Sequence, residues 1–481
     1  MSAAAEGVVV DEGVNGGGDR ASAGGESVSS GSDGRCAAGD RLSAKGDGVK
    51  SAGEGVHAAR AGNSFEGWDL RPPSPSSLGD HEVPLLSNQL AGRRIALLVS
   101  GSIAALRSPD LARALRRRGA EVTAFCSPEA LHYVGRQALE WATCRPLVTD
   151  LSWRAEHLSD DAPFDAWLLA PATYNSIGKL ANGIADTVVT AALASALGRL
   201  GQGQTQVLVA PCLHGSLHNA VLERNCQTLR QMGVVLVPPR DAYGKHNLPE
   251  AEVLVAAVCR ALASGSLRGR RLLVTGGPTP VPLDAVRRLV NRFKGQLASA
   301  LAEELVLRGA AVQLLLGEGS TPPPSWLPHR LADSYDSYSQ QVLEAVAGGL
   351  DAGLFSAAVA DYRPVQTDDD KTASGQPRWT LELQPTAKVI EAVRQADPKL
   401  YMVTFKYLEH ASVDELLEEA RRRLIRYQLV VANRGAETRG HAQTAWLVSR
   451  SGCQQLEGKA AIAKGIADHL EQALPRWQGV S

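Results

Sequence analysis

The sequence predicts an α/β protein with two tandem, doubly wound, Rossmann-like parallel-sheet domains behind a disordered N-terminal tail. Three observations predict this fold class. From residue 93 onward, short apolar runs of strand length alternate with amphipathic helical stretches. The alternation stops at a short linker, residues 264–270, and then begins again. The first 91 residues lack any such period. Alternating strands and helices indicate a parallel sheet with helices on both faces.

The first 91 residues are rich in Gly, Ser, Ala, Asp and Glu, with few long apolar side chains. Such a segment cannot bury enough surface to offset the entropy lost on ordering. We therefore predict a dispensable low-complexity tail over 1–91, a first domain over 92–265 and a second over 266–481. The tail has neither the basic start nor the apolar core of a signal peptide.

The composition of the chain argues against several classes of function. The formal net charge of −1 gives no basic footprint for nucleic acid. No apolar run reaches the roughly 20 residues of a membrane span. The seven cysteines form no C-x-x-C pair and are odd in number, which argues against a disulfide framework or a metal site. We expect a cytoplasmic protein that binds neither nucleic acid nor membrane.

The elements follow in order from the apolar runs. In the first domain the predicted strands are 94–100, 120–127, 165–171, 206–211 and 234–239, with helices over 108–119 and after Asn182. In the second domain the predicted strands are 270–277, 310–319, 352–360, 401–406, 427–433 and 445–450, with helices over 295–309, 412–426 and 456–474. The loop motifs differ, so the two domains are not an internal repeat.

Small residues follow the first strands of the first domain. Gly101 and Ser102 stand between a strand and a helix, and Ser127 ends the next strand. Such loops let backbone N–H groups and a helix N-terminus approach an anion. No G-x-G-x-x-G occurs, so a dinucleotide fingerprint is not supported. The stretch APATYNSIGKLANGIAD, residues 170–186, also joins a strand to a helix, where ligands bind in open sheets. The alternative is a tight connection in which Asn175 caps the helix.

GSIAA, the isolated His157 and residues 170–186 together resemble the homo-oligomeric flavin-containing cysteine decarboxylases. The resemblance implies that Gly101, Ser102 and Ser127 hold the FMN phosphate, and that Thr173 and Asn175 contact flavin or substrate. It makes His157 the catalytic base. It also implies trimers of this domain, with the helix over LANGIAD at a subunit interface.

The second domain resembles the phosphopantothenate-cysteine ligases in LLVTGGPTPVPLDAVRRLVNRFKG and SAAVADYRPVQTDDDK. The resemblance implies catalytic roles for Asn291 and Lys371, Mg²⁺, CTP or ATP as co-substrate, and dimers of this domain. Asp361 would face the nucleotide base. The alternative for Lys371 is a solvated loop lysine beside an acidic run. The remaining residues implied to bind substrate or nucleotide are Gly276, Gly277, Thr279, Arg287, Ala358, Phe405 and Asn433.

Together the two halves resemble the fused enzymes of coenzyme A biosynthesis, with phosphopantothenate, cysteine and a nucleoside triphosphate as substrates. The first half departs from the family pattern at two places. His214 replaces the Asn that binds the substrate carboxylate, and residues 238–252 lack the Cys that reduces the ene-thiol intermediate. We expect ligation to proceed and complete decarboxylation to be weak. The alternatives are a non-catalytic flavin-binding scaffold, or a flavin domain that acts on another thiol.

Overall fold

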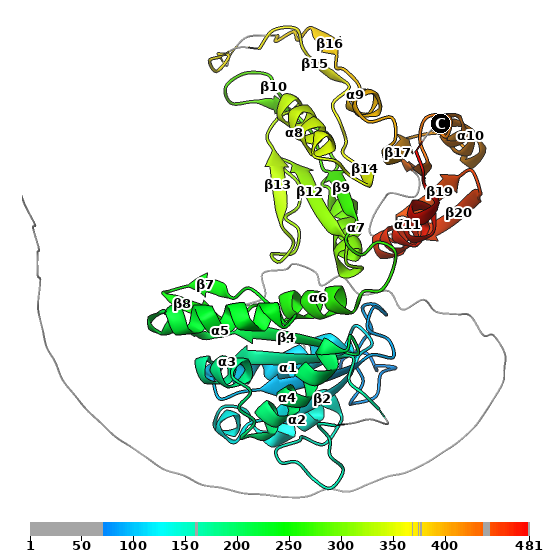
Figure 1. Ribbon diagram of the computed structural model, residues 1–481. Coiled ribbons are helices and arrows are strands. Elements are labelled where there is room, and N and C mark those ends of the chain that lie inside the picture. Colours follow the sequence, from blue (N-terminus) through cyan, green and yellow to red (C-terminus); the bar gives the residue numbers. More distant parts are fainter. Residues whose placement is uncertain are drawn as a thin grey trace, which may run out of the picture. The chain divides into compact units, whose positions relative to one another are not determined.

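The structure is a computed structural model that describes residues 71–158, 162–367, 369–373, 375, 378–435 and 443–479. Residues 75–481 form a compact unit separate from residues 1–74. Most of the predicted tail, residues 1–70, lies outside the described residues. Two α/β domains follow (Figure 1).

The first domain is built on a parallel sheet of strand order β2-β1-β3-β4-β6. Its elements are β1 (Arg94–Val99), η1 (Ile103–Arg107), α1 (Ser108–Arg116), β2 (Glu121–Cys126), η2 (Pro128–His132), α2 (Arg136–Thr143), β3 (Ala166–Ala172), α3 (Tyr174–Ala181), α4 (Val188–Gly201), β4 (Gln206–Pro211), β5 (Leu213–His214), η3 (Gly215–Leu217), α5 (Ala220–Gln231), β6 (Val235–Leu236), β7 (Arg240–Ala242), β8 (Lys245–Asn247) and α6 (Ala251–Leu262).

Alternate residues of each central strand enter different cores, because side chains alternate across a strand. In β1, Ile95 and Leu97 pack with α1, α2 and α6 on one face of the sheet. Ala96 and Leu98 pack with α3, α4 and α5 on the other face. A strand that is buried on both sides carries a nearly continuous apolar run, and this is why RIALLV is a reliable strand signal.

Described residues that belong to the first domain precede the boundary expected at residue 92. Leu90 is fully buried in the core formed with α1 and α6, and Val83 is 8% exposed. The backbone N–H groups of Leu86 and Leu90 donate to the carbonyls of Arg117 and Arg118 at 2.8 and 2.9 Å. Two apolar side chains in a polar segment therefore hold it against the end of α1.

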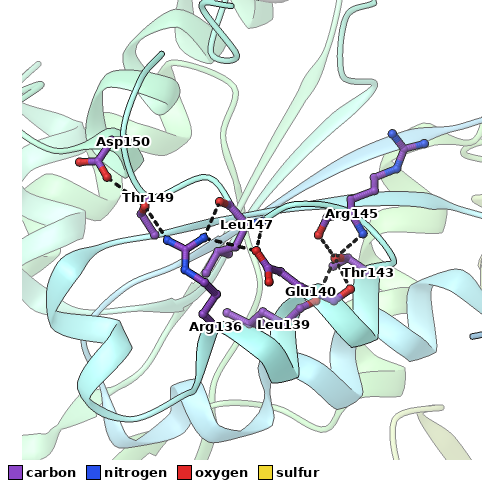
Figure 2. Close-up of polar contacts among 8 residues, drawn as sticks. All are labelled: Arg136, Leu139, Glu140, Thr143, Arg145, Leu147, Thr149 and Asp150. Carbon is purple, nitrogen blue, oxygen red and sulfur yellow. Dashed lines mark hydrogen bonds and ion pairs between the residues drawn. The ribbon is translucent and has the colours of Figure 1, made fainter.

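The loop after α2 is fixed by side chains of that helix (Figure 2). Arg136 donates to the carbonyl of Leu147 at 3.3 Å, and the Glu140 carboxylate accepts from the Leu147 N–H at 3.1 Å. Val148 then forms a parallel bridge with Phe125 in β2. Because the bridge is parallel, the chain beyond Val148 leaves toward the carboxyl edge of the sheet.

The second domain holds an eight-stranded sheet of order β13-β12-β9-β14-β17-β18-β19-β20. Its elements are β9 (Arg271–Gly276), β10 (Val281–Pro282), β11 (Arg288–Leu289), α7 (Gln296–Leu307), β12 (Ala311–Gly317), β13 (His329–Ala332), α8 (Tyr335–Ala347), β14 (Ala352–Phe355), β15 (Tyr362–Pro364), β16 (Leu383–Pro385), α9 (Val389–Ala396), β17 (Tyr401–Leu408), α10 (Val413–Arg423), β18 (Leu429–Arg434), β19 (Thr444–Ser449), β20 (Gly452–Glu457), α11 (Lys459–Ala473) and η5 (Leu474–Arg476).

Six neighbouring strands of this sheet, from β13 to β18, run parallel. Helices α7 and α11 cover one face, and α8 and α9 cover the other. The expected doubly wound architecture is thus confirmed in both domains. Among the described residues, no helix combines the length and the apolar character needed to cross a membrane.

Several local features differ from the sequence-based expectations. The strand expected over 234–239 is reduced to Val235–Leu236, since two prolines follow closely. The helix expected over LANGIAD ends at Ala181, and Gly183 has a φ of 69° that a helix does not allow. The expected strand 445–450 pairs antiparallel with β18 and with the unexpected β20. A short turn between β19 and β20 permits the second of these antiparallel pairings.

Candidate functional site

Each main sheet has a topological switch point, where successive strands are added on opposite sides of the first strand. In the first domain β1 has β2 on one side and β3 on the other. The Ser100 hydroxyl joins the two strand ends, since it donates to the carbonyl of Pro171 at 2.7 Å and accepts from the Thr173 N–H at 3.3 Å. Ligands of open α/β sheets bind beyond the carboxyl ends of strands at such a point.

Three short polar side chains cap helices at this edge. Ser102, Ser127 and Thr173 are the N-caps of η1, η2 and α3, and each hydroxyl accepts a backbone N–H at 3.2–3.3 Å. They follow β1, β2 and β3, which are neighbours in the sheet. Several helix N-termini therefore meet at one edge, which favours an anionic group there.

Gly101 lets two of these loops approach closely. A Cβ at Gly101 would lie 2.6 Å from the Cβ of Glu129 in η2. The loops of Gly101, Ser102 and Ser127, the residues predicted to hold the FMN phosphate, thus lie together at this edge, and Thr173, predicted to contact flavin or substrate, follows the neighbouring strand β3. Asn175 lies in the first turn of α3 behind the cap Thr173. The alternative in which Asn175 caps the helix is wrong, because the Thr173 hydroxyl makes the capping bond.

His157 lies in the segment that continues from Val148 toward the same sheet edge. Its Nδ1 is buried and has no hydrogen-bond partner among the described residues. Within that part of the chain, no hydrogen bond joins His157 to the three capping residues. An unpartnered buried ring nitrogen is costly unless another group meets it. This is consistent with a partner outside this chain, such as a bound ligand.

His214 lies at the end of β5, next to β4 in the chain. Its Nδ1 accepts from the N–H of Ser216 at 3.1 Å and lies 2.8 Å from the Ser216 hydroxyl. Strand β5 pairs with β8, and β8 pairs with β7. The segment that departs from the family pattern therefore forms a β7–β8 hairpin on β5. A contact between His246 of this hairpin and His218, which follows η3, was not predicted from the sequence. The ring nitrogens of the two histidines lie 2.9 Å apart.

The second switch point lies between β9 and β14, because β12 and β14 flank β9. Pro278 and Ala358 form a parallel bridge beyond the two strand ends. The Ala358 N–H donates to the carbonyl of Gly277 at 2.8 Å, and the Thr279 hydroxyl accepts from the Ala360 N–H at 2.8 Å. Residues that the sequence places some 80 positions apart thus form one loop cluster.

Asn291 joins this cluster from a third segment, since its amide donates to the carbonyl of Ala358 at 2.9 Å. Gly276 is packed so tightly that a Cβ would lie 2.2 Å from the Cβ of Ala298 in α7. Gly295 caps α7 with a φ of 72°, and a Cβ added at Gly295 would lie 2.9 Å from the Gly277 nitrogen. Glycines therefore bring the N-terminus of α7 directly against the first loop, which is a phosphate-binding arrangement.

Asp284 anchors the segment that carries Lys371. The buried Asp284 carboxylate accepts from the N–H groups of Val286, Arg287 and Thr372 at 2.8, 2.7 and 3.2 Å. Burial alone would raise the pKa of Asp284, but these N–H groups and the Arg287 guanidinium outweigh it and hold the pKa at about 2. The Arg287 side chain also donates to the carbonyl of Thr372 at 2.6 Å. Arg287 thus fixes the loop, and Lys371 projects from it in an exposed position.

Three further cations line this edge and were not assigned from the sequence. Lys388 forms a short ion pair with Asp361. Lys406, at the end of β17, has a lowered pKa because of burial and of the nearby Arg423, while Glu419 and Asp361 act in the opposite direction. Arg292 donates to the Tyr407 hydroxyl at 2.9 Å. A lysine within an apolar strand, such as Lys406, is a sequence signal that could have predicted a cation at this edge.

The last two predicted residues have different surroundings. Asn433 is 9% exposed at the end of β18, opposite Tyr407, and thus lies at the same edge. Phe405 packs against the hydrophobic core between the sheet and helices α7 and α11. The structure gives Phe405 a packing role that needs no ligand.

Comparison with known proteins gives two domain matches and a set of full-length relatives. Residues 85–263 match the flavoprotein family, and residues 267–474 match the DNA/pantothenate metabolism flavoprotein C-terminal domain. The chain is 34% identical to the coenzyme A biosynthesis bifunctional protein CoaBC of Thermococcus kodakarensis, over 82% of this chain and 100% of the relative.

Two other relatives are also similar over most of their length. The proteins of the same name from Bacillus subtilis and Mycobacterium tuberculosis are 29% and 30% identical, over 72% and 79% of this chain and 86% and 96% of their own. A solved DNA/pantothenate metabolism flavoprotein from Streptococcus pneumoniae is 23% identical, covers 42% of this chain and 99% of its own, and has a TM-score of 0.40.

Proposed function

The chain belongs to the family of coenzyme A biosynthesis bifunctional proteins CoaBC, and from this premise we propose that it joins phosphopantothenate to cysteine and then decarboxylates the product to phosphopantetheine. The second domain performs the ligation and the first domain, a flavoprotein with FMN, performs the decarboxylation. The observation that supports the proposal best is the assembly of matched loop residues at both switch points.

Ligation needs an activated carboxylate, because a carboxylate is a poor electrophile. The carboxylate oxygen of phosphopantothenate attacks the α-phosphorus of CTP or ATP, and pyrophosphate leaves. The amine of cysteine then attacks the acyl carbon, and the nucleoside monophosphate leaves with the bonding electrons. Lys371, Lys388 and Lys406 would offset the charge on the phosphates, and Mg²⁺ would supply further positive charge when bound. The glycine loop at Gly276 and Gly277 leaves room for phosphate oxygens beside the N-terminus of α7.

The first domain fits a flavin phosphate on its own geometry. The capping hydroxyls of Ser102 and Ser127 and the close approach at Gly101 form the cradle, and Thr173 and Asn175 lie beside it at the start of α3. FMN supplies a hydride acceptor and donor when it is bound. His157 then acts as the base at its unpartnered Nδ1, and His214 meets the substrate carboxylate.

The proposal also covers the oligomeric state and the location of the protein. The flavin domain forms trimers and the ligase domain forms dimers in a cytoplasmic homo-oligomer, with no nucleic acid or membrane as partner. Sedimentation of the holoprotein measures the oligomer directly. A monomeric protein with full flavin content would contradict this part of the proposal.

A single incubation tests both activities. Purified holoprotein is mixed with phosphopantothenate, cysteine, Mg²⁺ and either CTP or ATP, and the products are followed by mass spectrometry. We expect phosphopantothenoylcysteine with a preferred nucleotide, followed by slower loss of CO₂. Absence of any nucleotide-dependent product would overturn the ligase assignment.

Flavin absorbance separates the decarboxylase from its main alternative. His214 and the hairpin without a cysteine favour, as a second candidate, a flavin domain that binds FMN without turnover. An active domain shows transient bleaching of the flavin when phosphopantothenoylcysteine is added anaerobically. A domain that stays yellow and releases no CO₂ is a binding scaffold.

A further inference from the structure

The loop between β15 and β16 carries Lys371 on one side and Trp379 on the other. Its base is closed, because β15 pairs antiparallel with β16 and the N–H of Val365 donates to the carbonyl of Glu382 at 2.9 Å. We call residues 369–373 the lysine arm and residues 378–382 the tryptophan arm. The ligation chemistry described above uses the lysine arm and leaves the tryptophan arm without a role.

A turn from a different part of the chain contacts both arms. It joins β10 to β11, and its Leu283 N–H donates to the carbonyl of Arg287 at 2.9 Å. The Arg287 guanidinium donates to the carbonyl of Thr372 in the lysine arm at 2.6 Å. The Cζ atom of the same guanidinium lies 4.5 Å from the centroid of the Trp379 ring in the tryptophan arm. Arg287 therefore bridges the two arms.

The bridge rests on a buried anion. Arg287 Nε lies 3.0 Å from Asp284 Oδ2, and the Asp284 side chain is 0% exposed, whereas that of Arg287 is 37% exposed. A planar guanidinium stacks well on an aromatic face, and tryptophan provides the strongest attraction of this kind. The carboxylate and the indole ring thus hold one guanidinium from two sides of its hydrogen bond to Thr372.

Core packing does not explain Trp379. Its side chain is 36% exposed, and it belongs to none of the five hydrophobic clusters formed by the described residues. A tryptophan gains most of its stabilisation from the large area that it buries. An indole that stays at the surface of a polar loop and covers a guanidinium is placed for that contact.

We propose that Trp379 is a positioning residue for Lys371, and that it acts through Arg287. The backbone beside Lys371 is held at two points, since the Thr372 N–H donates to Asp284 at 3.2 Å and the Thr372 carbonyl accepts from Arg287. Confining Arg287 to one orientation keeps this anchor in place. A charge that is already oriented stabilises a transition state without the cost of ordering the loop in each turnover. The proposal rests on the ligase function proposed above.

The anchoring is tested first without turnover. Full-length protein is treated with trypsin under native conditions, and cleavage after Lys371 is followed by mass spectrometry. Cleavage of a native loop tracks the population of its open form, so Trp379→Leu should be cut roughly fivefold faster. Trp379→Phe keeps an aromatic face and should stay close to the wild type. The same cleavage rate in Trp379→Leu and the wild type would overturn the anchoring.

The chain offers a matched control. In the first domain the Trp141 ring lies 4.2 Å from the Cζ atom of Arg113, and the Trp141 side chain is 47% exposed. Trp141→Leu removes a stack of the same kind from a helix that carries no predicted site residue. It should change neither the cleavage after Lys371 nor the rate of ligation.

Turnover tests the role in catalysis. Formation of phosphopantothenoylcysteine is measured with Mg²⁺ and the preferred nucleotide. Trp379→Leu should lower kcat roughly fivefold with the KM for the nucleotide nearly unchanged, and Trp379→Phe should recover most of the rate. In a Lys371→Gln background, Trp379→Leu should cause no further loss, because there is no cation left to position. An equal fivefold loss in both backgrounds would show a general defect of the domain and would overturn the positioning role.

The outcomes separate this proposal from the ligase assignment. If the wild type ligates and Trp379→Leu ligates at the same rate, the positioning role fails and the ligase assignment stands. If the wild type forms no nucleotide-dependent product, the ligase assignment fails. The role of Trp379 in catalysis then fails with it, even where trypsin shows that the ring anchors the lysine arm.

Discussion

Leu90→Ala should destabilise the flavin domain, although Leu90 stands in a segment that the sequence places in a disposable tail. The side chain is fully buried against the core shared with α1 and α6. Replacing a buried Leu by Ala removes its transfer free energy and leaves a cavity, which costs 2–5 kcal/mol, so we expect about 3 kcal/mol. Leu86, four residues earlier, is 65% exposed. Leu86→Ala should therefore cost less than about 0.5 kcal/mol.

Release of FMN during urea unfolding is the appropriate assay, because flavin fluorescence reports only on the first domain. Leu90→Ala should lower the urea midpoint clearly, and Leu86→Ala should not. Two truncations extend the test: removal of residues 1–74 should leave the midpoint unchanged, whereas removal of residues 1–91 should lower it at least as far as Leu90→Ala. Equal midpoints for both truncations would show that burial of Leu90 contributes nothing to stability.

Three further predictions concern the ligase domain. Lys371→Gln should slow ligation by roughly 10²-fold, since charge stabilisation of about 3 kcal/mol is lost. The control Lys464→Gln on α11 should leave the rate unchanged. Equal rates for the two variants would refute a catalytic role for Lys371. Gly276→Ala should prevent the domain from folding, because its Cβ would lie 2.2 Å from that of Ala298; a native circular dichroism spectrum and normal ligation would contradict this. The pKa of Asp284 in the folded protein is about 2, below an unfolded pKa of about 4. Its contribution to stability is therefore present above the unfolded pKa and is lost as the pH falls toward 2. Acid unfolding of Asp284→Asn should lack this component, and an unchanged acid profile would refute it.

The sequence predicts the two sheets well because their central strands are buried on both faces. RIALLV and RLLVTG are nearly continuous apolar runs, as is typical of parallel strands that are buried on both faces. The loop motifs also fall where the parallel strands end. The switch points, with Gly101 after β1 and Gly277 after β9, follow from strand order, which the sequence alone does not give.

The short strands and the anchoring contacts could not be predicted for a physical reason. Strands of two or three residues, such as β5 and β10, carry no period. The role of Asp284 depends on a backbone N–H of Thr372, 88 positions away in the chain. Leu90 was missed because a single apolar residue in a polar segment gives no pattern, and its burial depends on the end of α1.

Under the proposed function, the two switch points would present different chemistry to phosphate, in keeping with the two reactions. The first edge carries neutral hydroxyl caps, Ser102, Ser127 and Thr173, at helix N-termini. Neutral donors suffice for the phosphate of a resident cofactor, because its charge does not change during turnover. The second edge adds Lys371, Lys388 and other cations to its glycine loop. Pyrophosphate gains charge as it leaves, and mobile cations stabilise charge that develops in a transition state. Removing a cation should therefore affect the rate of ligation more than the binding of nucleotide.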